Sequence, residues 1–201
     1  MRTYYIKEKT ETSGWDQANV LDIDNAQWVE DIGIRAHAQI MWDSSGLYLH
    51  LFTTEKDIRA EYHGPLSMIS EDSCLEFFFQ PIEYDARYFN FEVNPNGEFY
   101  IGFQIDRINA VRIKTGGLDD SRLNVKTNIT EDGWEAYYKI PVEIIQLFFP
   151  GYNLVHGVRL RANCFKCGDK TKIPHYYSWN YVDNDYPDFQ KHDYFGLMVL
   201  E

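Results

Sequence analysis

The sequence is poor in basic residues. Nineteen lysines and arginines stand against 31 aspartates and glutamates, which gives a formal net charge of −12 over 201 residues. Nucleic-acid backbones and anionic membrane surfaces attract proteins through concentrated positive charge. We therefore expect neither nucleic acid nor a membrane as a partner.

Cysteine is also scarce, with three residues, Cys74, Cys164 and Cys167. An odd number cannot pair completely within one chain, and secreted disulfide frameworks normally use an even number. No apolar run reaches the roughly 18 residues of a membrane span, and the first residues lack the apolar core of a secretory signal. The sequence as it stands predicts a cytoplasmic protein, or a secreted one if a signal peptide has been removed.

Two metal-binding hypotheses follow from the acidic residues and the cysteines. Cys164 and Cys167 lack a second cysteine pair for a four-ligand zinc site, and residues three apart on a strand point to opposite faces. Calcium is a possible cofactor because acidic loop pairs offer oxygen ligands, but none has a recognised calcium-loop spacing, so solvated acidic turns are favoured. These pairs are Asp22/Asp24, Asp119/Asp120 and Asp183/Asp185.

Proline and glycine are too few, at 7 and 13 residues, for a collagenous or low-complexity chain. The chain is 44% hydrophobic and 25% charged, as in ordinary globular proteins, and its length suits one domain, residues 1–201. Aromatic residues, in contrast, make up 16% of the chain. Such residues suit strands, cores and binding surfaces.

Period-two alternation dominates the sequence and predicts strands. The one convincing helix is expected over 142–148, with Pro141 at its first position. Many short strands with turn signals between them predict an all-β fold, an antiparallel β-sandwich of jelly-roll or immunoglobulin-like type with one short helix. The expected strands are 35–42, 47–54, 73–80, 88–93, 99–105, 123–129, 134–140, 158–166, 176–179 and 196–200.

Alternation also predicts which polar side chains share a sheet face. Glu76 shares its face with Cys74 and Phe78, while Phe89, Phe91 and Val93 turn Asn90, Glu92 and Asn94 to the opposite surface. The same pattern groups Arg159, Arg161 and Asn163. We therefore expect Glu76 or Glu92 to form an ion pair with Arg161.

Such a face has two interpretations. Structural ion pairs across strands are the commoner one. The other is a sugar site, because planar polar groups match vicinal hydroxyls and an aromatic ring covers the C–H face of a sugar. The hydrogen-bonding candidates are Glu76, Glu92, Asn94, Arg161 and Asn163, and the aromatic candidates are Trp179 and Phe189, from residues 176–181 and 186–189; Trp134 is assigned to the core.

The ordered motifs resemble family 9 carbohydrate-binding modules and their DOMON-like relatives over nearly the whole chain. The resemblance implies a β-sandwich that binds oligo- or polysaccharides without cleaving them, usually beside a glycoside hydrolase partner and sometimes with calcium. The motifs are residues 38–43 (AQIMWD) with Leu47 and Tyr48, Asp57, 72–78 (DSCLEFF), 88–97 (YFNFEVNPNG), 133–136 (GWEA) with Ile140 and Pro141, 161–163 (RAN), Ser178 and Trp179, Phe189, and 194–196 (YFG).

Only some of the family's site positions are occupied by matching residue types in this chain. In well-known members two tryptophans clamp a sugar ring, and the first of these positions falls in residues 68–70, which contain no aromatic residue. The second falls on Phe189, the acidic position falls on Glu76, and Glu92 stands where the family has a basic residue.

Two further hypotheses stay open. DOMON relatives include haem proteins with Met and His ligands, and this chain offers Met41, Met68, His37, His63, His175 and His192. Glu76 and Glu92 on neighbouring strands also have a spacing that a glycoside hydrolase needs. The sequence shows no nucleophile elbow, phosphate loop or metalloprotease motif, so we do not expect an enzyme.

Overall fold

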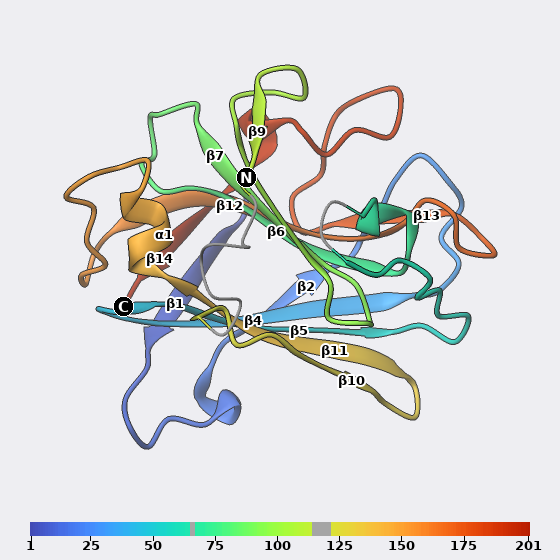
Figure 1. Ribbon diagram of the computed structural model, residues 1–201, viewed down its shortest axis with the longest axis horizontal. Coiled ribbons are helices and arrows are strands. Elements are labelled where there is room, and N and C mark those ends of the chain that lie inside the picture. Colours follow the sequence, from blue (N-terminus) through green and yellow to red (C-terminus); the bar gives the residue numbers. More distant parts are fainter. Residues whose placement is uncertain (65–66, 114–121) are drawn as a thin grey trace.

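Two layers of β-strands form the protein, as the computed structural model shows for residues 1–64, 67–113 and 122–201 (Figure 1). The first layer contains β2 (Val20–Ile23), β4 (Arg35–Asp43), β5 (Gly46–Thr54), β10 (Lys126–Ile129) and β11 (Gly133–Pro141). The second contains β3 (Asn25–Ala26), β6 (Cys74–Gln80), β7 (Tyr88–Val93), β8 (Phe99–Gln104), β9 (Ala110–Arg112), β12 (Arg159–Gly168), β13 (His175–Ser178) and β14 (Gly196–Leu200).

Strand β1 (Thr3–Glu8) joins the two layers. It pairs in parallel with β14 in one layer and with β4 in the other, whereas the other strand pairs of the described residues are antiparallel. The expected β-sandwich is therefore confirmed, but its sheet is mixed where β1 closes it. Because the N-terminal and C-terminal strands are neighbours, the layers form one continuous curled sheet.

Each expected strand is present, although its ends differ slightly. The expected strand 123–129 begins only at Lys126, because residues 123–125 lie in a turn. The helix α1 covers Val142–Gln146, and Pro141 precedes it as the last residue of β11. Short 3-10 helices cover Trp15–Gln17 (η1), Ile69–Glu71 (η2) and His192–Tyr194 (η4). None of the helices in the described ranges has the length and apolarity to cross a membrane.

The main core lies between the two layers. Strand β6 contributes Leu75, Phe77 and Phe79 to it, as the alternation predicts, and Trp134 on β11 is fully buried there as expected. Phe79 stacks on Phe89 of β7 at a ring-centroid distance of 5.3 Å. The inner faces of both layers are thus packed by the apolar half of each strand.

A second apolar cluster lies on the outer face of the β6–β7–β12 sheet. Cys74 and Phe78 of β6 meet Phe165 and Cys167 of β12 there, and Cys164 points instead into the main core, so the two cysteines of β12 do face opposite ways. Segments far along the chain cover this face with Ile69, Val182, Phe189 and Phe195. These covering segments and the strands beneath them form the walls of a pocket.

Candidate functional site

The pocket has a volume of about 230 Å³ and lies on the outer face of the second layer. Its floor comes from β6, β7 and β12, and its walls come from loops after β3, β8, β12 and β13. A volume below the roughly 300 Å³ at which drug-sized pockets begin suits a single small ring. The lining residues are Trp28, Ser70, Glu76, Glu92, Arg107, Cys167, Asp169, Tyr176, Pro187, Asp188, Phe189 and Gln190.

Glu76 and Glu92 lie directly opposite each other on β6 and β7 and both face this pocket. Burial raises the pKa of Glu76 well above its usual range, and the neighbouring Glu92 raises it further. Burial also raises the pKa of Glu92, to about 7, although Asn90 donates a hydrogen bond of 2.8 Å to its Oε1 and Arg112 lowers it. The two acids therefore carry less than two negative charges near neutral pH.

Three aromatic rings form one wall of the pocket. Phe189 stacks on Phe165 with centroids 4.1 Å apart, Trp28 contacts Phe189 at 5.2 Å, and Tyr176 meets Trp28 edge-on at 5.7 Å. Phe189 is 8% exposed and Trp28 is half-buried. The rings of Trp28, Tyr176 and Phe189 thus give the pocket an apolar lining in addition to its carboxyl groups.

Trp28 is held in a backbone conformation that a bulky residue rarely adopts, with φ at +61°. Its indole Nε1 donates to the carbonyl of Asn184 at 2.7 Å. The preceding Gln27 is buried, donates from Nε2 to the carbonyl of Val182 at 2.7 Å and accepts a bond from Ser178. Backbone strain of this kind persists where surrounding contacts impose it, and such positions concentrate at binding sites.

Charged groups line the rim of the pocket. Arg107 pairs with Asp188 at 3.2 Å, and Lys191 lies 3.5 Å from the other oxygen of that carboxylate. Asp188 also accepts a bond from the backbone N–H of Gln190. These contacts stabilise the segment that carries Phe189.

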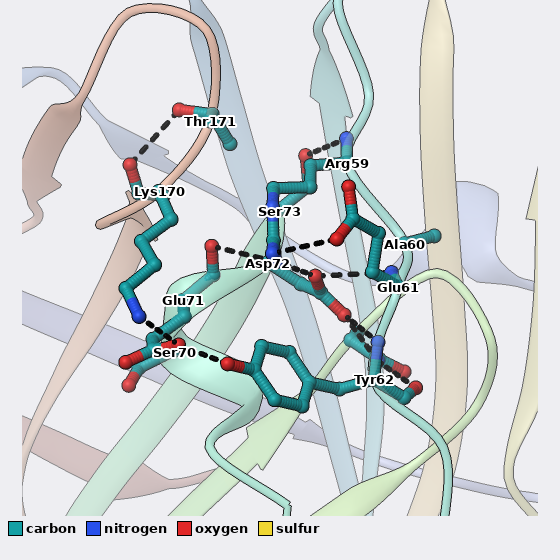
Figure 2. A network of polar contacts seen from close by, with 12 residues as sticks. Arg59, Ala60, Glu61, Tyr62, Ser70, Glu71, Asp72, Ser73, Lys170 and Thr171 are labelled. Atoms are coloured by element: carbon teal, nitrogen blue, oxygen red, sulfur yellow. Dashed lines mark hydrogen bonds and ion pairs between the residues drawn. The ribbon is translucent and has the colours of Figure 1, made fainter.

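A network around Asp72 connects β6 to residues 59–62 (Figure 2). The fully buried Asp72 carboxylate accepts bonds from the backbone N–H groups of Glu61 at 3.1 Å and Tyr62 at 2.9 Å, and it pairs with Arg59. It also accepts a 2.9 Å bond from Asn94. Asn94 is not among the residues that line the pocket, because its amide is buried and holds the loop, and its contact with a sugar stays a prediction.

The ion pair expected for Arg161 is also wrong. The register places Arg161 opposite Gln80, whereas Glu76 lies opposite Phe165, four residues further along β12. Four residues of strand are about 13 Å long. Arg161 donates instead to the carbonyls of Asp193 at 3.1 Å and Phe195 at 2.5 Å, beside a separate pocket.

Trp179 and Asn163 are likewise not at the pocket. Trp179 packs edge-on against Tyr4 in the main core and is 4% exposed, so of the two aromatic candidates it is Phe189 that lines the pocket. Asn163 is fully buried, donates to the carbonyl of Asn180 and accepts bonds from two backbone N–H groups. Both residues contribute to packing and loop support.

Of the seven expected site residues, the structure thus places Glu76, Glu92 and Phe189 together at one pocket; their contact with sugar stays a prediction. Sequence reasoning missed Trp28 and Arg107, which reach the pocket from loops. Loop residues follow no periodic pattern. The sequence could have pointed to Trp28 only because tryptophan is a residue type that suits binding surfaces. Tyr176 lies in residues 176–181, a segment expected to supply an aromatic ring, and it is the residue of that segment that lines the pocket.

Of the acidic residues considered for calcium, Asp22 and Asp24 have other partners, and calcium binding stays a prediction. Asp22 contacts His37 at 2.8 Å, and Asp24 pairs with Arg2 at 2.5 Å. Asp119 and Asp120 fall outside the described residues. Across the described ranges, one group of potential metal ligands converges, formed by Cys74, Glu76 and Cys167.

The chain is similar to known proteins in sequence and in structure. Residues 9–200 match the family described as carbohydrate-binding family 9. A Bacteroides uniformis protein for which carbohydrate binding has been suggested is similar in structure, with a TM-score of 0.84, 24% identity and coverage of 100% of this chain and 99% of that one. No curated protein sequence matches the chain.

A family 9 carbohydrate-binding module from Caldicellulosiruptor kristjanssonii is also similar in structure. Its complexes with glucose and with cellotriose both have a TM-score of 0.69, at 13% and 14% identity. They cover 100% of this chain, which in turn covers 96% and 94% of those chains. At such identities the structures establish the shared fold, and the family match over residues 9–200 goes further: this chain belongs to carbohydrate-binding family 9.

Proposed function

We propose that the pocket between Glu76, Glu92 and the Trp28–Tyr176–Phe189 wall binds one ring of an oligo- or polysaccharide without cleaving it. The observation that supports this proposal is that two carboxyl groups and three aromatic rings line the same small pocket. The hydroxyl groups at the edge of a sugar ring can hydrogen-bond to carboxyl groups, and the C–H groups on its face can pack against aromatic rings.

Trp28 compensates for the aromatic residue missing near Met68. In family members with two tryptophans, one ring lies on each side of the sugar, and this chain has no aromatic residue at the first position. Trp28 reaches the pocket from the loop after β3 and contacts Phe189, the residue at the second position. The aromatic surface is thus built on one side from two segments rather than as a clamp.

The protonation state of the acids suits neutral hydroxyl groups. A protonated carboxyl group donates one hydrogen bond and still accepts others, whereas a carboxylate only accepts. Because burial and proximity raise the pKa of both Glu76 and Glu92, the pair offers both roles near neutral pH. Binding that depends on a protonated carboxyl group of Glu92 weakens as the pH rises above about 7.

The family supports a non-catalytic role, in preference to the hydrolase and haem hypotheses. The glucose and cellotriose complexes of the Caldicellulosiruptor module make β-glucan oligomers the first ligands to test. Within the proposal, the domain works beside a glycoside hydrolase and keeps a DOMON-like ancestry. A single aromatic wall supports dissociation constants in the millimolar or high-micromolar range, because ordering costs consume much of the stacking gain.

Calorimetric titration with glucose, cellotriose and a panel of other oligosaccharides tests the proposal. We expect Trp28→Ala and Phe189→Ala to weaken binding at least tenfold, since each removes apolar area that would cover the sugar. Trp15→Ala is the matched control, because Trp15 stacks beside His50 and Tyr137 on the outer face of the other layer. Unchanged thermal midpoints would show that the variants fold.

The proposal fails if no sugar in the panel binds below about 10 mM. It also fails if Trp15→Ala weakens binding as much as Trp28→Ala does, because the ligand would then lie on the other layer.

A further inference from the structure

Two thiols and a carboxyl group converge beneath the pocket. Cys74 on β6 and Cys167 on β12 are direct cross-strand partners, and Glu76 lies two residues beyond Cys74 on the same face. The Cys167 thiol donates to Glu76 Oε1 at 3.0 Å. The two Sγ atoms and the carboxylate oxygen all lie within 4.8 Å of one another, and all three residues are buried.

We infer that Cys74, Cys167 and Glu76 form a binding site for a thiophilic divalent cation of the Zn²⁺ type. Two thiolates and one carboxylate are a ligand set that Zn²⁺ accepts. The inference goes beyond sugar binding and does not depend on which sugar the pocket takes.

The arrangement requires little rearrangement to hold the ion. Zinc–sulfur bonds of about 2.3 Å and zinc–oxygen bonds of about 2.1 Å place tetrahedral ligands some 3.5–4 Å apart. The three ligand atoms already lie within 4.8 Å of one another, so rotation of the side chains would bring them towards that range. Cys167 and Glu76 also line the pocket, so the ion has an entry path and the fourth position is open to water.

The electrostatics of the cluster favour a cation. Burial raises the pKa of the Cys74 thiol to about 12, and the hydrogen bond from Cys74 together with burial raises that of Cys167. Glu92 and Asp169 add negative charge near Glu76, whereas the buried Lys166 adds positive charge near Cys74. A divalent cation would offset this concentration of acidic groups, and its binding would release their protons.

Titration with Co²⁺ under reducing conditions tests the site, because thiolate ligation gives sulfur-to-cobalt charge-transfer absorption and intense visible bands for a tetrahedral ion. We expect one Co²⁺ per chain, displaced by Zn²⁺. Cys74→Ser and Cys167→Ser should abolish the charge-transfer bands and weaken metal affinity at least tenfold. Cys164→Ala is the matched control, since Cys164 lies in the main core on the other face of β12.

A second measurement separates loss of ligands from loss of fold. Zn²⁺ should raise the thermal midpoint of the wild type and of Cys164→Ala, and should leave that of Cys167→Ser and Glu76→Gln unchanged. Equal thermal midpoints of the wild type and the variants without metal would show that the variants fold. If Cys74→Ser proves unstable, Glu76→Gln and Cys167→Ser still decide the matter.

The inference is overturned if Co²⁺ binds without charge-transfer bands, or if Cys164→Ala loses the metal as Cys167→Ser does. It is also overturned if the reduced wild type binds no metal, with both thiols confirmed as free. Failure here is distinguishable from failure of the sugar proposal, because Trp28→Ala should lose sugar affinity and keep the metal site.

Discussion

At the scale of single residues, the buried Glu76–Glu92 pair lowers the stability of the folded protein when both carboxyl groups are charged. Like charges directly opposite each other on neighbouring strands oppose folding, and both side chains are buried. The pKa of Glu92 rises from 4.5 to about 7, so the folded protein binds a proton more tightly than the unfolded chain does. The stability associated with this proton is present below about pH 4.5 and is lost as the pH rises through 7.

Glu92→Gln should therefore flatten the pH dependence of stability. Urea unfolding at pH 5 and pH 8 should show the variant to be more stable than the wild type at pH 8, by an amount on the order of 3 kcal/mol, with little difference at pH 5. Glu131→Gln, at an exposed turn position, is the control and should leave the difference between the two pH values unchanged. A wild-type stability that rises between pH 5 and pH 8 in step with that of Glu92→Gln would contradict the shifted pKa.

At the scale of elements, the start of β6 organises a loop with no regular structure. Asp72 accepts bonds from the backbone N–H groups of Glu61 and Tyr62 and from the Asn94 amide, and Glu71 contacts both Tyr62 and Lys170 (Figure 2). Ser73 adds a bond from the Arg59 N–H to its Oγ at 3.0 Å. The loop therefore depends on one buried carboxylate rather than on a strand partner.

Asp72→Ala should lower the free energy of unfolding by about 3–5 kcal/mol, because it leaves Arg59, Asn94 and two backbone N–H groups without their acceptor. Asp57→Ala is the control: its carboxylate is 61% exposed and pairs with the exposed Lys172. That variant should change stability by no more than about 0.5 kcal/mol in urea unfolding. Equal effects of the two substitutions would show that the loop is anchored elsewhere.

At the scale of the whole molecule, β1 decides whether the two layers act as one unit. Its parallel pairing with β14 and β4 connects the first residues of the chain to both sheets. Tyr4 and Ile6 point into the core, and the Tyr4 hydroxyl donates to the carbonyl of Asn19. The last residue takes part as well, since its carbonyl accepts a bond from the Trp42 indole.

Ile6→Ala should therefore destabilise the whole domain by about 2–5 kcal/mol, as other large-to-small changes in a core do. Tyr5→Ala, on the other face of the same strand, removes a side chain that is 48% exposed and should change stability by about 0.5 kcal/mol or less. Both layers should unfold together in Ile6→Ala, so that tryptophan fluorescence and far-ultraviolet circular dichroism give one transition. Two separate transitions would mean that β1 does not couple the layers.

The sequence by itself determined the strands and the face on which each side chain lies. Because strand side chains alternate with a period of two, Leu75, Phe77 and Phe79 were predictable as core residues and Glu76 as a residue of the opposite face. The same local rule separated Cys164 from Cys167, and the proline at position 141 helped to predict the helix α1. Alternation needs no knowledge of neighbouring strands, which is why these predictions are correct.

Only the tertiary structure decided which of those faces meet. The register of β12 against β6 places Cys167 beside Cys74 and moves Arg161 some four residues away from Glu76. Loop packing brings Trp28 to Phe189 across most of the chain's length and turns Trp179 into the core. Register and loop packing are set by contacts between residues far apart in sequence, so local periodicity carries no information about them.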